Sequence, residues 1–175
     1  MYIALQTERL KLRSIGVQDA NFILDLVNSK GWLKFIGDRK IADKNDAEQY
    51  IQRILDKEKY YYTVFELKDV QNAIGIVTFL HREEEAFPDI GFAILPEFEG
   101  NGYTFEACKA YLNQVKGSKT YENIIAFTIP SNEKSIGLLI KLGLYHIGDH
   151  KKAEKTLSYF SLKNENSINN KSENQ

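Results

Sequence analysis

The sequence predicts an α+β fold with three layers, in which helices cover both faces of a mostly antiparallel central sheet of about seven strands. Two observations carry this prediction. Segments with apolar residues at helical spacing alternate with short segments rich in β-branched and aromatic residues. Three of the latter, at 60–67, 73–80 and 89–95, follow one another without a helix between them, which favours antiparallel pairing. The length fits a single domain, which we expect over 1–163.

Before these three strands, the sequence predicts one strand and two helices. In the strand at 9–14, leucines alternate with charged residues. The first helix is expected to begin at Asp19. The second is expected to begin at Asn45, because Glu48 three residues later completes a pair typical of a capping box. The segment 28–38 between the two helices contains two glycines and is predicted to be a loop.

After the three strands, the sequence predicts a helix, a strand, a second helix and two closing strands. Their expected ranges, in that order, are 103–115, 122–129, 133–142, 144–150 and 156–162. The polar composition of residues 164–175 predicts a disordered tail.

Composition and charge argue against several classes of function. A formal net charge of -1 gives no sign of the basic surface that nucleic-acid binding needs. Cys108 is the only cysteine and the histidines show no metal-ligand spacing, so neither a disulfide nor a metal site is expected. No apolar run approaches the roughly 20 residues of a membrane span, and the N-terminus has no signal-peptide pattern. We therefore expect a cytoplasmic protein without a metal, a nucleic-acid partner or a membrane contact.

The most informative segment, Ile90 to Tyr103, joins a predicted strand to a predicted helix. Pro96 ends sheet pairing, because it has no N–H to donate. Gly100 and Gly102 allow a tight turn and the close approach of a ligand. A helix N-terminus follows with unpaired N–H groups and a partial positive charge, which suits a diphosphate. Such glycines also serve ordinary turns, and no familiar nucleotide-binding loop is present, so this segment alone leaves both interpretations open.

A second motif lies in the next predicted helix and contains Asn132, Ser135 and Lys141. Ser135 shares a helix face with Leu138 and Leu142, so its side chain is expected on the inward, largely apolar side. Taken alone, Asn132 could be a helix cap and Ser135 could bond to its own backbone.

Together the two motifs resemble those of the GNAT N-acetyltransferases. In the acetyl-CoA-binding loop of that superfamily, a first residue is followed three and five positions later by glycines. Here these are Glu97, Gly100 and Gly102, and Glu at the first position is similar to the RimJ/RimL branch. The Asn-x-x-Ser and Lys-x-Gly pattern resembles the same branch, although Leu144 replaces the usual aromatic residue. The resemblance extends over residues 7–162 and implies the acyl-CoA N-acyltransferase fold, with acetyl-CoA as co-substrate.

The resemblance also implies a set of residues that contact acetyl-CoA. Backbone amides from Gly100 to Thr104 are expected to hold the pyrophosphate, and backbone groups of the preceding strand to meet the pantetheine arm. The full expected set is Ile94, Leu95, Gly100, Asn101, Gly102, Tyr103, Thr104, Asn132, Ser135 and Lys141.

The implied reaction is direct transfer of acetyl to a primary amine, without an acyl-enzyme. Backbone N–H groups near Ile94 and Leu95 are the expected oxyanion donors, because the strand must separate from its neighbour to admit the thioester. Asp89 matches an acidic residue at the start of this strand in many GNAT enzymes, and is the candidate general base, acting through a water. The alternative for Asp89 is a solvated carboxylate at a strand end.

Ser135 is the candidate general acid. Many GNAT enzymes place a tyrosine seven positions after the motif's asparagine, and this chain has Leu139 there. Ser135 then either protonates the leaving thiolate or merely contacts CoA. Cys108 is expected in the core and not as a nucleophile.

The amine acceptor is less well specified by the sequence. Trp32, Phe35 and Asp38 form the candidate wall of its site, although the aromatic residues suit a core equally well. The acceptor is expected to be a peptide N-terminus or a small amine, and the chain a monomer or homodimer. Two alternatives remain: a non-catalytic acyl-CoA-binding sensor on the same fold, and an unrelated phosphate-binding domain.

Overall fold

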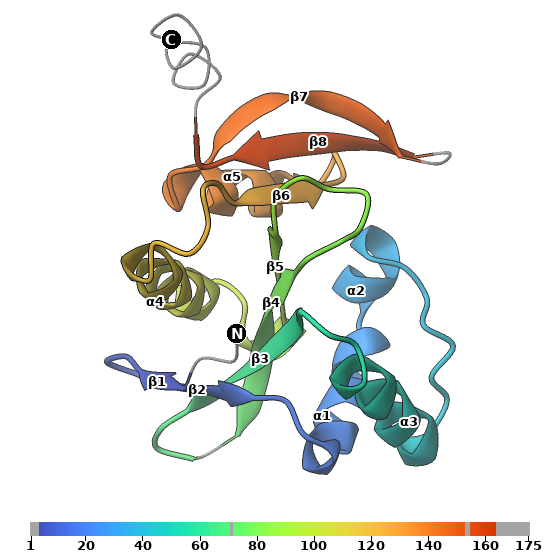
Figure 1. The fold of residues 1–175 in the computed structure, drawn as a ribbon. Coiled ribbons are helices and arrows are strands. Elements are labelled where there is room, and N and C mark those ends of the chain that lie inside the picture. The colour runs from blue at the N-terminus through green and yellow to red at the C-terminus, as the bar shows by residue number, and fades with distance from the viewer. Residues whose placement is uncertain (1–3, 71, 153–154, 164–175) are drawn as a thin grey trace, which may run out of the picture.

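A computed structural model describes residues 4–70, 72–152 and 155–163. One sheet runs through the whole described chain, with helices on both of its faces (Figure 1). The tail predicted at 164–175 lies outside the described residues.

The central sheet has eight strands in the order β1-β2-β3-β4-β5-β6-β8-β7. In chain order the strands are β1 (Leu5–Gln6), β2 (Leu10–Ser14), β3 (Tyr60–Leu67), β4 (Ala73–Leu80), β5 (Asp89–Ile94), β6 (Ile125–Thr128), β7 (Tyr145–Lys152) and β8 (Lys155–Ser161). All neighbours are antiparallel except β5 and β6. The predicted mostly antiparallel sheet is therefore confirmed, with β1 as an extra strand that is too short to leave a pattern in the sequence.

The helices divide between the two faces of the sheet. In chain order they are η1 (Val17–Asp19), α1 (Ala20–Val27), α2 (Lys30–Phe35), α3 (Lys44–Leu55), η2 (Pro96–Phe98), α4 (Tyr103–Gly117) and α5 (Glu133–Lys141). Helices α1 to α3 form a group beside β3 and β4, while α4 lies across the opposite face of these strands (Figure 1). Helix α5 packs on β6 and β7.

Successive side chains of each strand point to opposite faces of the sheet, and apolar side chains form a core on each face. Neighbours on β3 illustrate it: Val64 packs towards α1 to α3, and Phe65 packs towards α4. Cys108 is fully buried in the α4 side of the core, as expected from the sequence. The two cores hold β4 and β5 rigidly between them, and these strands present the functional residues described below.

The segment 28–38, predicted to be a loop, contains helix α2, so that prediction is wrong. Ser29 caps the helix by accepting a hydrogen bond from the backbone of Trp32. Trp32 is 5% exposed and anchors the short helix to the core beside α1. Tertiary burial of this indole outweighs the low helix propensity of the glycine that precedes it.

Helix α3 also begins earlier than predicted, and Asn45 is not its cap. Asp43 is the N-cap, and its carboxylate accepts a hydrogen bond from the amide of Asp46 at 2.9 Å. The Asp46 carboxylate in turn accepts from the amide of Ala42 at 3.0 Å. Two aspartates three residues apart therefore satisfy the N-terminal amides, as Ser and Glu do in the usual capping box.

Candidate functional site

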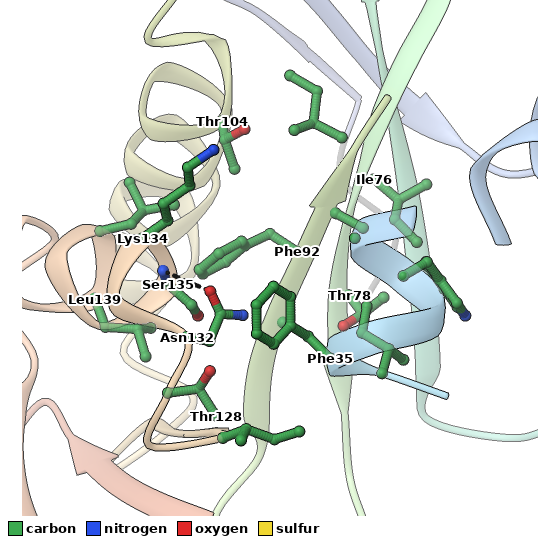
Figure 2. Close-up of a pocket in the computed structure, with 18 of the residues that line it drawn as sticks. Phe35, Ile76, Thr78, Phe92, Thr104, Thr128, Asn132, Lys134, Ser135 and Leu139 are labelled. Carbon is green, nitrogen blue, oxygen red and sulfur yellow. Dashed lines mark hydrogen bonds between the residues drawn. The ribbon is translucent and has the colours of Figure 1, made fainter. Parts of the chain in front are cut away.

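The site lies where two parallel strands of the sheet separate. Strands β5 and β6 pair only at their first residues, Asp89 and Ile125, where the Ile125 amide donates to Pro88 O at 3.0 Å. Beyond this point β5 continues along β4, and β6 continues along β8. A cleft of about 1170 Å³ is lined by residues from β4, β5, α2 and the N-terminal ends of α4 and α5 (Figure 2).

The separation leaves backbone amides of β5 pointing into the cleft. The Leu95 amide donates to Ile74 O of β4 at 2.9 Å, and Ala93 lies opposite Ile76 in the same antiparallel register. Because amide direction alternates along a strand, the amides of Phe92 and Ile94 point away from β4, towards the gap left by β6. The expectation that Leu95 offers a free oxyanion donor is therefore wrong. The amide of Phe92, which the sequence argument overlooked, faces the gap together with that of Ile94.

A glycine turn connects the end of β5 with helix α4. Gly100 and Gly102 both have φ of +79°, in the left-handed region that favours glycine. Gly102 is the N-cap of α4, and no side chain caps the helix from this position. The first amides of α4, from Tyr103 and Thr104 onward, have no partner within the helix and carry its partial positive charge. Gly100, Gly102, Tyr103 and Thr104 all line the cleft, which fits a diphosphate at this turn.

Arg9 fastens this turn from outside the cleft. Its guanidinium donates to Asn101 O at 3.0 Å and to the Glu106 carboxylate at 2.7 Å, and it stacks 4.5 Å from the centre of the Tyr103 ring. Burial alone would raise the pKa of Glu106, but hydrogen bonds from Thr7 and Arg9 outweigh it and hold that pKa below its usual value. These contacts fix the start of α4, although nothing in the sequence pattern singled out Arg9.

Asn101 differs from the other residues expected to contact acetyl-CoA. Its side-chain amide donates to the carbonyls of Phe98 and Glu99 at 3.2 and 3.1 Å, and it lies outside the lining of the cleft. Leu95 also lies outside that lining, whereas Ile94 is part of it. The Asn101 side chain therefore forms hydrogen bonds within the turn and does not line the cleft.

The second motif lies across the cleft from β5. Asn132 is the N-cap of α5, and its side-chain oxygen accepts a hydrogen bond from the Ser135 amide at 3.3 Å. Figure 2 shows the side chains of both residues facing Phe92. Lys141, at the far end of α5, lies 4.4 Å from the centre of the Phe105 ring of α4. The two motifs, separate in sequence, therefore converge on one cleft.

Asp89 lies on the opposite face of β5 from Phe92, with Gly91 and Ala93, as the strand parity predicts. Its side chain is 9% exposed, and its carboxylate accepts a hydrogen bond from Arg82 Nε at 3.2 Å. The alternative of a solvated carboxylate is therefore wrong. A Cβ on Gly91 would lie 2.6 Å from Thr78 Oγ1, so the Thr78 side chain takes the space that a larger residue would need on this face of the strand.

The candidate acceptor wall is only partly formed by the predicted residues. Phe35 projects from α2 into the cleft (Figure 2). Trp32 lines the cleft and is also a core residue, with its indole N–H donating to Gly37 O at 3.1 Å. Asp38 lies outside the lining, and its carboxylate accepts from the amide of Lys40 at 2.6 Å. The structure therefore does not bring Asp38 to the cleft.

Three residues that the sequence argument missed line the acceptor side instead: Arg39, Tyr62 and Arg82. Burial raises the pKa of the Tyr62 hydroxyl, as does its contact with Tyr50, while both arginines act to lower it. These residues come from a loop, a strand and a strand end far apart in sequence, so no local pattern could group them.

Within the ranges that the structure describes, no group of three or more His, Cys, Asp or Glu residues could hold a metal ion. No helix among the described residues is long and apolar enough to cross a membrane.

Comparison with known families decides between the remaining interpretations of this cleft. Residues 9–145 match the family model described as "Acetyltransferase (GNAT) domain". The chain belongs to the GNAT acetyltransferase family. Membership makes it an acetyl-CoA-dependent acyltransferase by family, and the alternative of an unrelated phosphate-binding domain is wrong.

Relatives of this GNAT chain share its full architecture. The uncharacterized N-acetyltransferase YnaD of Bacillus subtilis is 24% identical over 148 residues, which cover 85% of this chain and 86% of YnaD. A ribosomal-protein-S5-alanine acetyltransferase from Vibrio fischeri superposes with a TM-score of 0.77 at 21% identity, covering 91% of this chain and 95% of that one. RimL, a ribosomal L7/L12 alpha-N-protein acetyltransferase, superposes with a TM-score of 0.78 at 13% identity, covering 92% and 94%. The predicted likeness to the RimJ/RimL branch is thus confirmed at the level of the fold.

Proposed function

We propose that this protein transfers the acetyl group of acetyl-CoA directly to a primary amine, either a peptide N-terminus or a small amine. One observation carries the proposal: the gap between β5 and β6 presents free strand amides beside the uncapped N-terminus of α4. The gap suits the thioester arm of acetyl-CoA, and the helix N-terminus suits its pyrophosphate.

The residues of the cleft suit distinct parts of acetyl-CoA. Amides of Gly100, Gly102, Tyr103 and Thr104 would bind the pyrophosphate, and Ile94 would meet the pantetheine arm. Asn132, Ser135 and Lys141 approach the same ligand from α5, where Asn132 also fixes the helix start. Both helices direct an N-terminus at the cleft, so both favour an anionic ligand.

In the proposed reaction, the neutral amine nitrogen attacks the thioester carbonyl carbon. The amides of Phe92 and Ile94 stabilise the oxyanion, because neither amide is used by β4. The carbon–sulfur bond then breaks, and CoA leaves as a thiolate that takes a proton from the Ser135 hydroxyl. The nitrogen loses its proton through a chain of waters to Asp89, which Arg82 holds in place. Asp89 then releases this proton to solvent, and solvent returns a proton to Ser135.

Thermal unfolding with saturating acetyl-CoA tests the binding half of this proposal. A ligand at about 100 times its Kd adds roughly 2.7 kcal/mol of stability. For a chain of this length, this corresponds to a rise in Tm of about 5–10 °C. NAD and ATP serve as ligand controls, and Gly100→Val as the variant control, because φ of +79° strains a β-branched residue. The absence of any shift with acetyl-CoA would overturn the proposal.

A second candidate, a non-catalytic acyl-CoA sensor, is favoured by two features. Leu139 occupies the position of the expected tyrosine and is 1% exposed, so it offers no proton. Asp89 is already engaged by Arg82. Acetyl-CoA consumption with an amine panel separates the candidates, since a sensor would show the Tm shift without amine-dependent release of CoA.

A further inference from the structure

The acceptor side of the cleft carries an excess of positive charge. Its charged lining residues are the cations Lys34, Arg39, Arg82 and Lys155, and the anions Asp89 and Glu99. Asp89 is paired with Arg82 through Nε at 3.2 Å, and Glu99 is paired with Lys134 at 2.7 Å. The acidic run from Glu83 to Glu85 that follows Arg82 lies outside the lining. A polycationic acceptor would therefore meet repulsion at this end of the cleft.

Two of these cations, Arg39 and Arg82, line the same cleft as Tyr62. Both lower the pKa of the Tyr62 hydroxyl, which burial and Tyr50 raise. Tyr62 lies opposite Thr78 on β4, and Thr78 lies opposite Gly91 on β5, so the Tyr62 side chain lies on the same face of the sheet as Asp89 and Gly91. A guanidinium has five N–H donors, so Arg39, 5.8 Å from the centre of the Trp32 ring, and Arg82, bonded to Asp89 through Nε, could each still donate to a carboxylate in the cleft.

The phosphates of acetyl-CoA do not account for Arg82. Arg82 lies at the end of β4 where Leu80 pairs with Asp89, whereas the glycine turn follows the opposite end of β5. From Asp89 to Ile94 the strand rises about 17 Å. A diphosphate at the start of α4 is therefore out of reach of Arg82, which pairs with Asp89 at the other end of β5.

We propose that Arg39 and Arg82 bind a carboxylate of the acceptor, so that the enzyme acts on amines that also carry an acidic group. This inference rests on the proposed acetyl transfer. The reacting amine must lie near the amides of Phe92 and Ile94. Phe92 is about 10 Å along the strand from Asp89, beside which Arg82 lies. An acidic side chain on a peptide spans this separation, whereas the α-carboxylate of a free amino acid lies too close to its amine.

A peptide series tests the inference directly. Three tetrapeptides would differ only at the second residue, as aspartate, asparagine or lysine, with free alanine and spermidine as the other acceptors. We expect kcat/KM for the aspartate peptide to exceed kcat/KM for the asparagine peptide by about tenfold. The difference between the aspartate and lysine peptides should be larger. Equal rates for aspartate and asparagine, or a preference for spermidine, would overturn the inference. Efficient acetylation of free alanine would contradict the proposed separation between the reacting amine and the acceptor carboxylate.

Charge-reversal variants test whether residues that line the cleft cause the preference for the aspartate peptide. Arg39 is exposed, so Arg39→Glu should fold normally, and it should invert the preference in favour of the lysine peptide. Lys40→Glu is the matched control, because the neighbouring Lys40 changes the net charge equally but lies outside the lining. Arg82→Lys keeps a charge beside Asp89 and should reduce the aspartate preference without inverting it. An unchanged preference in Arg39→Glu would contradict the inference.

The same experiment separates failure of this inference from failure of the proposed function. Acetylation of all three peptides at similar rates would remove only the acidic-acceptor assignment. If acetyl-CoA binds and no amine is acetylated, the proposed acetyl transfer is contradicted. The inference, which rests on acetyl transfer, is then contradicted as well. Acetyl-CoA affinity should be the same in Arg39→Glu, Lys40→Glu and the unaltered protein, since neither residue belongs to the glycine turn or to α5.

Discussion

At the scale of single residues, Ser135 offers the clearest test of the proposed chemistry. Ser135→Ala keeps the backbone N–H that donates to Asn132, so the cap of α5 survives. A thiolate is already a good leaving group, and we expect kcat to fall by only about tenfold, with acetyl-CoA affinity almost unchanged. Steady-state kinetics across pH would measure this. A kcat and pH profile equal to those of the unaltered protein would leave Ser135 as a mere CoA contact.

Asp89 is tested by an isosteric change. Asp89→Asn keeps an oxygen that can accept from Arg82 Nε, but it removes the proton acceptor. We expect kcat/KM to fall by about a hundredfold, and the rise of activity with increasing pH to flatten. Circular dichroism would check that the variant folds. If the rise with pH persists in Asp89→Asn, another group or solvent accepts the proton.

At the scale of secondary-structure elements, the start of α3 distinguishes the observed cap from the one the sequence suggested. Asp43→Ala removes the carboxylate that accepts from the Asp46 amide, and should cost about 1 kcal/mol of stability. Asn45→Ala is the matched control and should change stability little, because this residue lies inside the helix and is exposed. Urea unfolding of both variants would measure the difference. An equal or larger effect for Asn45→Ala would contradict the assigned cap.

The link between Arg9 and the start of α4 predicts a pH dependence of stability. The pKa of Glu106 is lower in the folded protein than its ordinary value of 4.5, so the folded state holds the carboxylate ionised more strongly than the unfolded chain does. The stabilisation is therefore fully present above pH 4.5 and is lost as pH falls through the lower, folded value. Glu106→Gln should unfold more easily at pH 7, but lose less stability on acidification. Parallel pH dependences of the urea midpoint would refute this.

The sequence predicted elements well where one local signal was strong. The ranges 60–67 and 73–80 match β3 and β4 to the residue, since β-branched and aromatic residues fill them and turns bound them. Helix α2 was missed because its stability comes from burying Trp32, which propensity does not record. The glycine turn and Asn132 could be recognised as motifs. The grouping of Arg39 with Arg82 could not, because it depends on how distant elements pack.

At the scale of the whole molecule, the cleft is the seam between two parts of the sheet. Strands β1 to β5 and strands β6, β8 and β7 meet through one parallel pairing, at Asp89 and Ile125. Acetyl-CoA bound in the gap would contact both parts, through α4 and β5 on one side and α5 on the other. Ligand binding should therefore stabilise the seam as well as the residues that touch the ligand.

Amide hydrogen exchange would show this coupling residue by residue. In the free protein, the Leu95 amide is bonded to Ile74 O and should exchange slowly, whereas the amides of Phe92 and Ile94 face the open gap and should exchange fast. Acetyl-CoA should slow Phe92 and Ile94 strongly and leave Leu95 little changed. The Ile125 amide, bonded to Pro88 O across the seam, should also gain protection. Slow exchange of Phe92 and Ile94 without ligand would mean that the gap is closed in solution, and that the amides assigned to the oxyanion are not available to it.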